Sequence, residues 1–264
     1  MTEPQSRVRL GGMALANGLL VHGPTFWAAA VRDDTGTTRV ASGRKLRLAR
    51  GPLGDIPFVR GVLRIGEALA VVPAARRGLP QARLAMEDAP VGVALALSGV
   101  ATLAARWRLR SVLAQETIGA IAGLVPALVA VNHSDAALWH GVEHKSIAAY
   151  EEGTDAAQAS KEHTRCGGNL ILPLVVTTVL GRAAARKVYA SPPAAVRAAV
   201  ALGSVGVALE VFAFAARRPE HPISRLVHAV GHGLQAGFST REPRAEDLAV
   251  GRAAMDEILR LEGA

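Results

Sequence analysis

Four long apolar stretches follow residue 88, and alanine, valine and leucine together provide most of their apolar residues. They cover residues 89–105, 117–131, 169–181 and 194–216. A helix that crosses a bilayer needs about 20 apolar residues, because the hydrocarbon core is about 30 Å thick. Only the last stretch is long enough by itself, so the others span only if flanking residues extend them. The pattern predicts about four membrane helices, with short or re-entrant spans included; the alternative is a soluble helical protein with very buried helices.

Outside these stretches, shorter patterns of apolar and polar residues predict three further elements. Residues 26–43, FWAAAVRDDTGTTRVASG, place turn-forming residues between two short apolar runs, which indicates a β-hairpin. Residues 57–87 mix apolar residues with arginines and predict an amphipathic helix, at an interface or against the rest of the protein. Residues 241–262 are charged and periodic, and they predict a water-facing helix.

Together these elements predict a mainly α-helical protein. We expect a membrane bundle of about four apolar helices, a small N-terminal region that contains a β-hairpin, and a water-facing C-terminal helix. Two domains are expected: a glycine-rich β region over residues 1–56, and a helical, membrane-associated domain over residues 57–264 that carries the candidate metal site described below.

The composition favours a membrane over a nucleic acid as the partner. Half of the 264 residues are hydrophobic, only 4% are aromatic, and the formal net charge is +8. No basic stripe interleaved with aromatic residues and no zinc-finger spacing accompanies this charge. The arginines instead flank apolar runs, as in RWRLR at 106–110 and GRAAARK at 181–187, where they suit anionic headgroups. Both segments favour the same side of a bilayer, so they leave the orientation open.

Residues 140–144, HGVEH, carry the strongest chemical signal. On a helix His140 and His144 lie on one face, about 40° apart, with Glu143 on the adjacent flank. Two such imidazoles can bind one divalent transition metal, with zinc expected, while the carboxylate reaches a water on that metal. The same HxxEH order occurs in the inverted zinc peptidases, where the glutamate is the general base.

Further ligands must come from elsewhere in the chain. Glu210 lies in an otherwise apolar stretch, where a carboxylate is costly unless it is paired or bound to metal. A salt bridge with Arg197 or Arg217 explains Glu210 equally well. His163 and Cys166 form an HxxC pair suited to zinc, although a buried cysteine is usually a small hydrophobic residue.

The remaining histidines are interpreted as surface or packing residues. His228 and His232 are also four residues apart, but no acidic residue stands next to them. His22, His133 and His221 have no partner nearby in the sequence. Cys166 is the only cysteine, which excludes an intrachain disulfide, and the N-terminal residues do not read as a removed signal peptide.

Several motifs occur in an order that resembles the YqhQ-like bacterial family. They are GGMALANGLLVHGP with FWAAAVR, FVRGVLRIGEAL, HGVEHKSIAAYEEG, HTRCGG, ALEVF and LQAGFSTREPRAEDLAVGRAAMDEIL, over roughly residues 10–260. That family is catalogued as domain of unknown function 1385 and is often labelled a metal-dependent enzyme. The resemblance implies an integral protein of the bacterial cell membrane, with its water-facing parts in the cytoplasm. It also implies that the family's motif positions fall on His140, Glu143, His144, His163, Cys166 and Glu210.

The N-terminal motif departs from the family pattern. Met13 and Asn17 stand where glutamine and glutamate are usual, and His22 stands where arginine is usual. If that glutamate had a catalytic role, Asn17 could not replace it. These differences indicate a diverged branch of the family.

These residues are consistent with three candidate functions. The first is a membrane-associated zinc hydrolase with Glu143 as general base, acting on peptides or lipid-linked molecules. The second is a non-catalytic protein in which a closed His/Cys zinc site only holds the fold together. The third, a metal-assisted transferase on a lipid phosphate, is disfavoured because magnesium sites require more oxygen ligands. We favour the hydrolase because Glu143 is superfluous in a structural site, although it would also serve to orient a ligand histidine.

Overall fold

Four short antiparallel strands form a meander near the N-terminus of the computed structural model, which describes residues 7–49 and 51–264. The strands are β1 (Gly11–Ala14), β2 (Gly18–His22), β3 (Phe26–Arg32) and β4 (Thr38–Arg44). The expected hairpin is confirmed as β3–β4, in which Arg32 pairs with Thr38. Its turn is closed by the Asp33 carboxylate, which accepts hydrogen bonds from the backbone N–H groups of Thr35 and Thr37. Strands β1 and β2 were not expected as separate elements, because both are short and begin with glycine.

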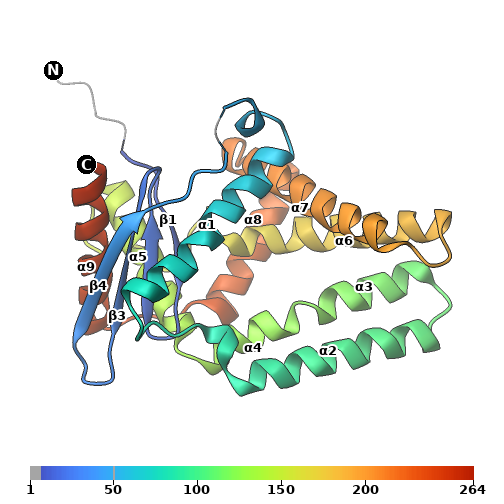
Figure 1. Ribbon diagram of the computed structural model, residues 1–264, viewed down its shortest axis with the longest axis horizontal. Coiled ribbons are helices and arrows are strands. Elements are labelled where there is room, and N and C mark those ends of the chain that lie inside the picture. The colour runs from blue at the N-terminus through green and yellow to red at the C-terminus, as the bar shows by residue number, and fades with distance from the viewer. Residues whose placement is uncertain (1–6, 50) are drawn as a thin grey trace.

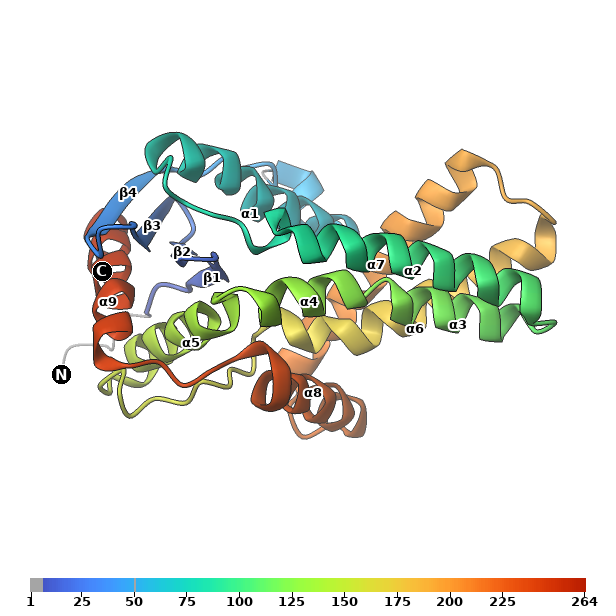
Figure 2. The same cartoon turned by 90° about the horizontal axis from the view of Figure 1, so that it is seen from below.

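Alternating side chains bury both faces of this sheet. The face formed by Leu19, Val21, Ala28 and Ala30 packs on α5 (Ala136–Glu152) and α9 (Ala245–Glu262). The face formed by Leu20, Trp27, Ala29 and Val31 packs on α1 (Val59–Gly78). Figure 2 shows the resulting layers, with the strands between α1 and α5. The strands therefore share their two apolar cores with helices from the later part of the chain.

Helix α1 is shorter than the amphipathic stretch expected over residues 57–87. It ends at Gly78, and the following Leu79-Pro80 leaves the helical conformation. Val71 and Ala75 bury its apolar side against the sheet. The short 3-10 helix η2 (Ala85–Glu87) then leads into the apolar helices.

The apolar stretches form helices long and apolar enough to cross a membrane, as expected. These are α2 (Ala89–Arg108), the pair α3 (Val112–Ala122) and α4 (Val125–His133), η3 (Gly167–Leu170) with α6 (Ile171–Val188), and α7 (Ala194–Arg217). They make four candidate spans of 20, 22, 22 and 24 residues, so flanking residues do extend the three short stretches. In an apolar window of 18 residues within each span, only 17% to 22% of the residues are buried inside the protein, so most of the window is at least partly exposed. Such a surface suits a lipid bilayer.

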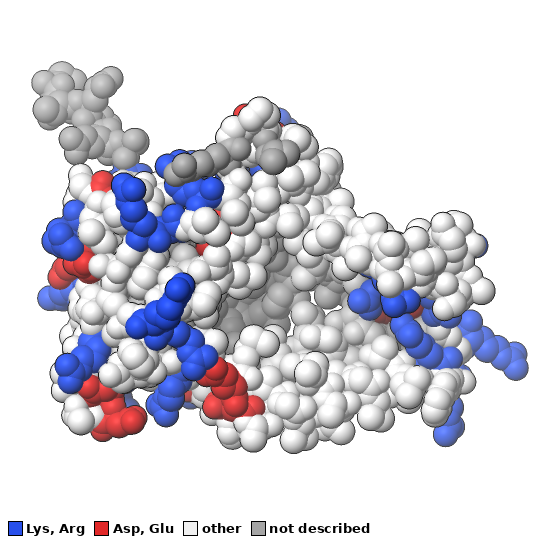
Figure 3. Space-filling model, in the orientation of Figure 1, with Lys and Arg blue, Asp and Glu red and all other residues white. Residues whose placement is uncertain are grey.

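The helical part projects from the sheet-containing body (Figure 1), and its two hairpin tips point the same way. Figure 3 shows the flank of this part as nearly free of charge except at the far end. That end carries RWRLR, at the close of α2, and the basic residues at the close of α6. The two basic segments therefore lie on the same side, as their composition suggested.

The last helices return to the body. Helix α8 (Pro222–Leu234) and the π-helix η4 (Gln235–Ser239) connect α7 to α9. Helix α9 is water-facing on its charged side only. Leu248, Ala254 and Ile258 on its other side are buried in the core against the sheet, because its apolar positions repeat at helical spacing.

Candidate metal centre

Helix α5 carries the HGVEH motif through the interior of the body, where Gly141, Glu143 and His144 are buried. Gly141 directly follows His140 in the motif. It lies where the chain after η4 crosses the helix. The Arg241 N–H donates a 2.8 Å hydrogen bond to the Ala137 carbonyl there. A Cβ atom at Gly141 would lie 2.1 Å from the Arg241 carbonyl oxygen, so only glycine allows this crossing.

Two histidines of α5 meet the single cysteine at this place. The donor atoms of His140, His144 and Cys166 all lie within 4.8 Å of one another. Cys166 Sγ is 3.4 Å from His140 Nε2, and the two imidazole centroids are 4.2 Å apart. In a tetrahedral zinc site with ordinary bond lengths, nitrogen and sulfur ligands lie about 3.6 Å apart. The spacing therefore fits one zinc ion.

Backbone carbonyls hold both imidazoles in the tautomer that a metal needs. His140 Nδ1–H donates to the Ser239 carbonyl at 2.8 Å, and His144 Nδ1–H donates to the Lys161 carbonyl at 2.6 Å. Because a carbonyl only accepts, Nδ1 carries the proton and Nε2 keeps its lone pair. Burial lowers the pKa of His140, and burial together with the neighbouring His140 lowers the pKa of His144 to about 3. Both rings are therefore neutral and able to ligate.

Cys166 supplies a third donor from the loop that leads into η3. Burial raises the pKa of its thiol to about 12, and Sγ accepts a 3.3 Å hydrogen bond from the Gly168 N–H. A bound metal would favour the thiolate form of Cys166, because a coordinating thiol loses its proton. Two neutral imidazoles and one thiol form a donor set suited to zinc.

Glu143 borders a cavity of about 170 Å³ that His140, His144 and Cys166 also line, called the candidate metal cavity, or metal cavity, below. Its carboxylate makes no hydrogen bond or ion pair to any of the described residues, and burial raises its pKa to about 8. Strand β1 makes room for it, since a Cβ atom at Gly12 would lie 2.6 Å from Glu143 Oε1. A carboxyl group without a partner therefore faces the cavity that the three donors line, and a cation bound there would favour its ionised form.

His163 lines this cavity but does not join the three donors. Its Nε2–H donates to Glu151 at 3.2 Å, and its Nδ1 accepts from the Arg165 N–H at 3.2 Å. Both ring nitrogens are therefore occupied. The ring centroid lies 5.8 Å from that of His144, so His163 borders the cluster.

Glu210 lies apart from the cluster, although it was expected as a candidate ligand. Its carboxylate accepts a two-point contact from Arg60, with Nε at 2.9 Å and Nη2 at 2.6 Å. The Phe58 N–H adds a third hydrogen bond at 3.1 Å. Glu210 thus joins α7 to the start of α1, and its partner is neither Arg197 nor Arg217.

Sequence reasoning missed the contribution of β1 and β2 to the cavity. His22, taken as a packing residue, lines the cavity, and Lys45 Nζ lies 3.4 Å from its Nδ1. Burial lowers the pKa of His22 to about 4. A Cβ atom at Gly11 would lie 3.0 Å from the His22 ring. The Gly11-Gly12 pair was the available signal, since adjacent glycines in a strand mark a close approach of other groups.

Asn17 has a structural role at this end of the sheet. Its amide donates 3.0 Å hydrogen bonds to the carbonyls of Arg32 and Gln81, and its oxygen accepts one from the Arg83 N–H at 3.0 Å. The side chain thereby ties the β1–β2 turn to the segment after α1. It is not among the residues that line the 170 Å³ cavity, so an asparagine at this position leaves the three donors intact.

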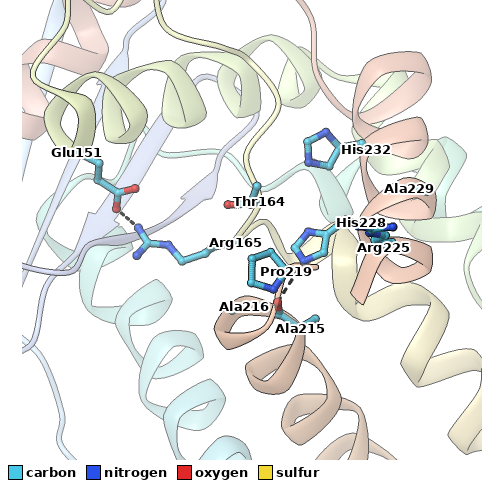
Figure 4. A pocket seen from close by; sticks show the side chains of 10 residues that line it. All are labelled: Glu151, Thr164, Arg165, Ala215, Ala216, Pro219, Arg225, His228, Ala229 and His232. Carbon is cyan, nitrogen blue, oxygen red and sulfur yellow. Dashed lines mark hydrogen bonds and ion pairs between the residues drawn. The ribbon is translucent and has the colours of Figure 1, made fainter. Parts of the chain in front are cut away.

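A larger pocket of about 790 Å³ lies beside the metal cavity, between the end of α7 and α8. Figure 4 shows His228 and His232 entering it from α8, while Arg165 reaches toward Glu151 on the opposite side. The two imidazole centroids are 6.4 Å apart, and neither residue belongs to the group of donor atoms. Arg165 lines both this pocket and the metal cavity.

In a comparison with known proteins, the second half of the chain matches one family model. Residues 135–261 match the sequence model of a family described as "Protein of unknown function (DUF1385)". The match begins at α5 and includes all three donors and Glu143. No curated protein and no solved structure matches the chain.

Proposed function

We propose that the protein is a zinc-dependent hydrolase of the bacterial cell membrane, in which His140, His144 and Cys166 hold the metal and Glu143 is the general base. One observation carries this proposal. Three zinc-type donors converge within 4.8 Å, and an unpaired carboxylate lines the same cavity. The four apolar helices support the membrane location.

A zinc ion bound there would supply Lewis acidity and would lower the pKa of a coordinated water to about 7. Glu143 accepts the proton of the attacking water. The water oxygen forms the new bond to the electrophilic carbon or phosphorus, and the bond to the leaving group breaks. Glu143 then delivers its proton to that leaving group. The carbonyls of Ser239 and Lys161 keep the two imidazoles oriented during this cycle.

The number of donors favours catalysis over a purely structural role. Structural zinc sites have four protein ligands, whereas catalytic sites have three and an open position. Among the described residues the group has three members, and Glu143 borders the remaining space. The structural alternative has one observation in its favour. Cys166 and the Lys161 carbonyl attach the loop before η3 to α5, which is what a structural ion would reinforce.

Metal analysis of the protein purified in detergent tests the site. We expect about one zinc per chain in the wild type and in Glu143→Gln, and loss of that zinc in His144→Ala and Cys166→Ser. His232→Ala is the matched control, because its ring lies in the neighbouring pocket and outside the donor group. A wild type without stoichiometric transition metal overturns the proposal.

Cobalt substitution separates the catalytic site from the structural one. Azide added to the cobalt protein should change its visible spectrum, because an open position accepts an exogenous ligand. A closed site with four protein ligands has no such position. An unchanged spectrum at saturating azide therefore contradicts the hydrolase and supports the structural role.

A further inference from the structure

Another cavity, of about 560 Å³, lies between α1 and α7, and it combines arginines with an apolar wall. Five arginines from separate parts of the chain line it: Arg9, Arg60, Arg64, Arg165 and Arg217. Ile65 and Ala68 of α1 and Leu209 and Phe212 of α7 provide much of the apolar lining. The cavity can therefore accommodate a ligand with an anionic end and a hydrocarbon end.

The charges in this cavity are not balanced by the protein. Among the described residues, Glu210 is the only carboxylate in the lining, and Arg60 donates hydrogen bonds to both of its oxygens. Arg165 pairs with Glu151. Arg9, Arg64 and Arg217 make no ion pair or side-chain hydrogen bond with any described residue. Guanidinium groups in such a cleft create a positive potential and offer fork-shaped donors that match a phosphate.

The cavity lies where the apolar helices meet the sheet-containing body. Arg217 is the last residue of α7, the longest candidate span. The start of α1 packs tightly on α7, since a Cβ atom at Gly61 would lie 2.9 Å from Leu209 Cβ. Phe58 and Val59 are exposed beside this contact. If α7 crosses the bilayer, the cavity at its end lies at the depth of the lipid headgroups, where arginines attract phosphates.

Arg165 connects this cavity to the metal centre. It lines the 560 Å³ cavity between α1 and α7, called the arginine cavity here, as well as the metal cavity and the 790 Å³ pocket. It also directly precedes Cys166 in the chain. A headgroup held by the other arginines would therefore lie next to the zinc donors. Within residues 7–49 and 51–264, no other residue lines both the arginine cavity and the metal cavity.

We infer that the substrate is a lipid with an anionic phosphate headgroup, whose phosphate is bound by Arg9, Arg64 and Arg217 while its chain lies along α1 and α7. Arg165 stands between this phosphate and the metal cavity, so the bond to be cleaved lies in or next to the headgroup. This inference rests on the proposed function for its catalytic part. The binding of the lipid can be measured without turnover.

Lipid titration followed by native mass spectrometry tests the inference on the full chain in detergent. The probes are dioctanoyl phosphatidic acid, phosphatidylcholine with the same chains, and inorganic phosphate. We expect phosphatidic acid to bind at least tenfold more tightly than phosphatidylcholine, and Arg64→Gln/Arg217→Gln to lose at least tenfold in affinity for it. Arg252→Gln is the matched control, an exposed arginine on α9, on the other side of the sheet.

The outcomes separate this inference from the proposed function. Equal affinity for the two lipids, or an unchanged affinity in Arg64→Gln/Arg217→Gln, overturns the lipid site even if zinc is bound. Inorganic phosphate that competes as well as phosphatidic acid also overturns it, because the site would then take a free anion. Selective lipid binding by a protein without zinc upholds this binding site and overturns the hydrolase. Zinc content of the double variant should equal that of the wild type, which shows that the fold is retained.

Discussion

Cys166 Sγ lies 3.4 Å from His140 Nε2, although 26 residues separate the two in the chain. The intervening loop leaves α5 at Gly153, which has a positive φ of 74° and caps the helix. It returns along α5, where the Lys161 carbonyl accepts from His144. The contact between sulfur and nitrogen is thus a product of the loop's path, and the same path orients the second histidine.

Gly141→Ala should weaken zinc binding by about tenfold or more, because a Cβ atom there would displace the Arg241 backbone that crosses α5. That displacement also moves Ser239, whose carbonyl orients His140. Competition with a chromophoric chelator measures the affinity, and circular dichroism checks the helix content. Gly233→Ala is the control, because its Cβ atom would meet nothing within 4 Å. Wild-type affinity in Gly141→Ala would show that the crossing does not set the site.

Gly12→Ala should destabilise the protein by about 1–3 kcal/mol, through the clash of its Cβ atom with the Glu143 carboxylate. The same change should be nearly neutral in a Glu143→Ala background, where the space is vacated. Denaturant unfolding of the four proteins gives the coupling energy between the two positions. If the losses of unfolding free energy caused by Gly12→Ala and Glu143→Ala simply add in the double variant, β1 needs Gly12 for a reason other than Glu143.

Glu210→Gln should leave zinc content unchanged and lower the melting temperature. The change weakens the two-point contact with Arg60 that joins α7 to α1. Metal analysis and thermal unfolding of one preparation give both results. Arg60→Gln should lower the melting temperature similarly, and the double variant should cost little more than either single one. Loss of zinc in Glu210→Gln would restore this residue as a ligand.

Cysteines placed at Ser111 and Ser191 should react with a membrane-impermeant maleimide from one side of the bilayer. A cysteine at Thr35, in the β3–β4 turn, should react only from the other side. The reason is that both hairpin tips lie at the far end of the apolar helices (Figure 1). Cys166 is buried and serves as the unreactive internal control. Labelling of all three positions from the same side would exclude spanning helices.

Local patterns explain which elements could be predicted. The apolar stretches, the β3–β4 hairpin and the spacing of His140 and His144 each depend on neighbours within a few residues. Their periodicity is therefore visible in the sequence. Strands β1 and β2 were missed because their stability comes from a core shared with α5 and α9, which follow much later in the chain. Sequence alone likewise could not assign Arg60 to Glu210, 150 residues away.

By itself, the sequence determined the helical class, four long apolar stretches, and two imidazoles on one face of a helix. Those properties follow from hydrophobic period and residue type. Only the tertiary structure decided that Cys166 completes the donor group, that His163 borders it, and that Glu210 is engaged elsewhere. It also decided that Gly12 admits Glu143 to the cavity. The physical reason is that a donor group needs contacts within a few ångströms, and folding brings these about between segments far apart in the chain.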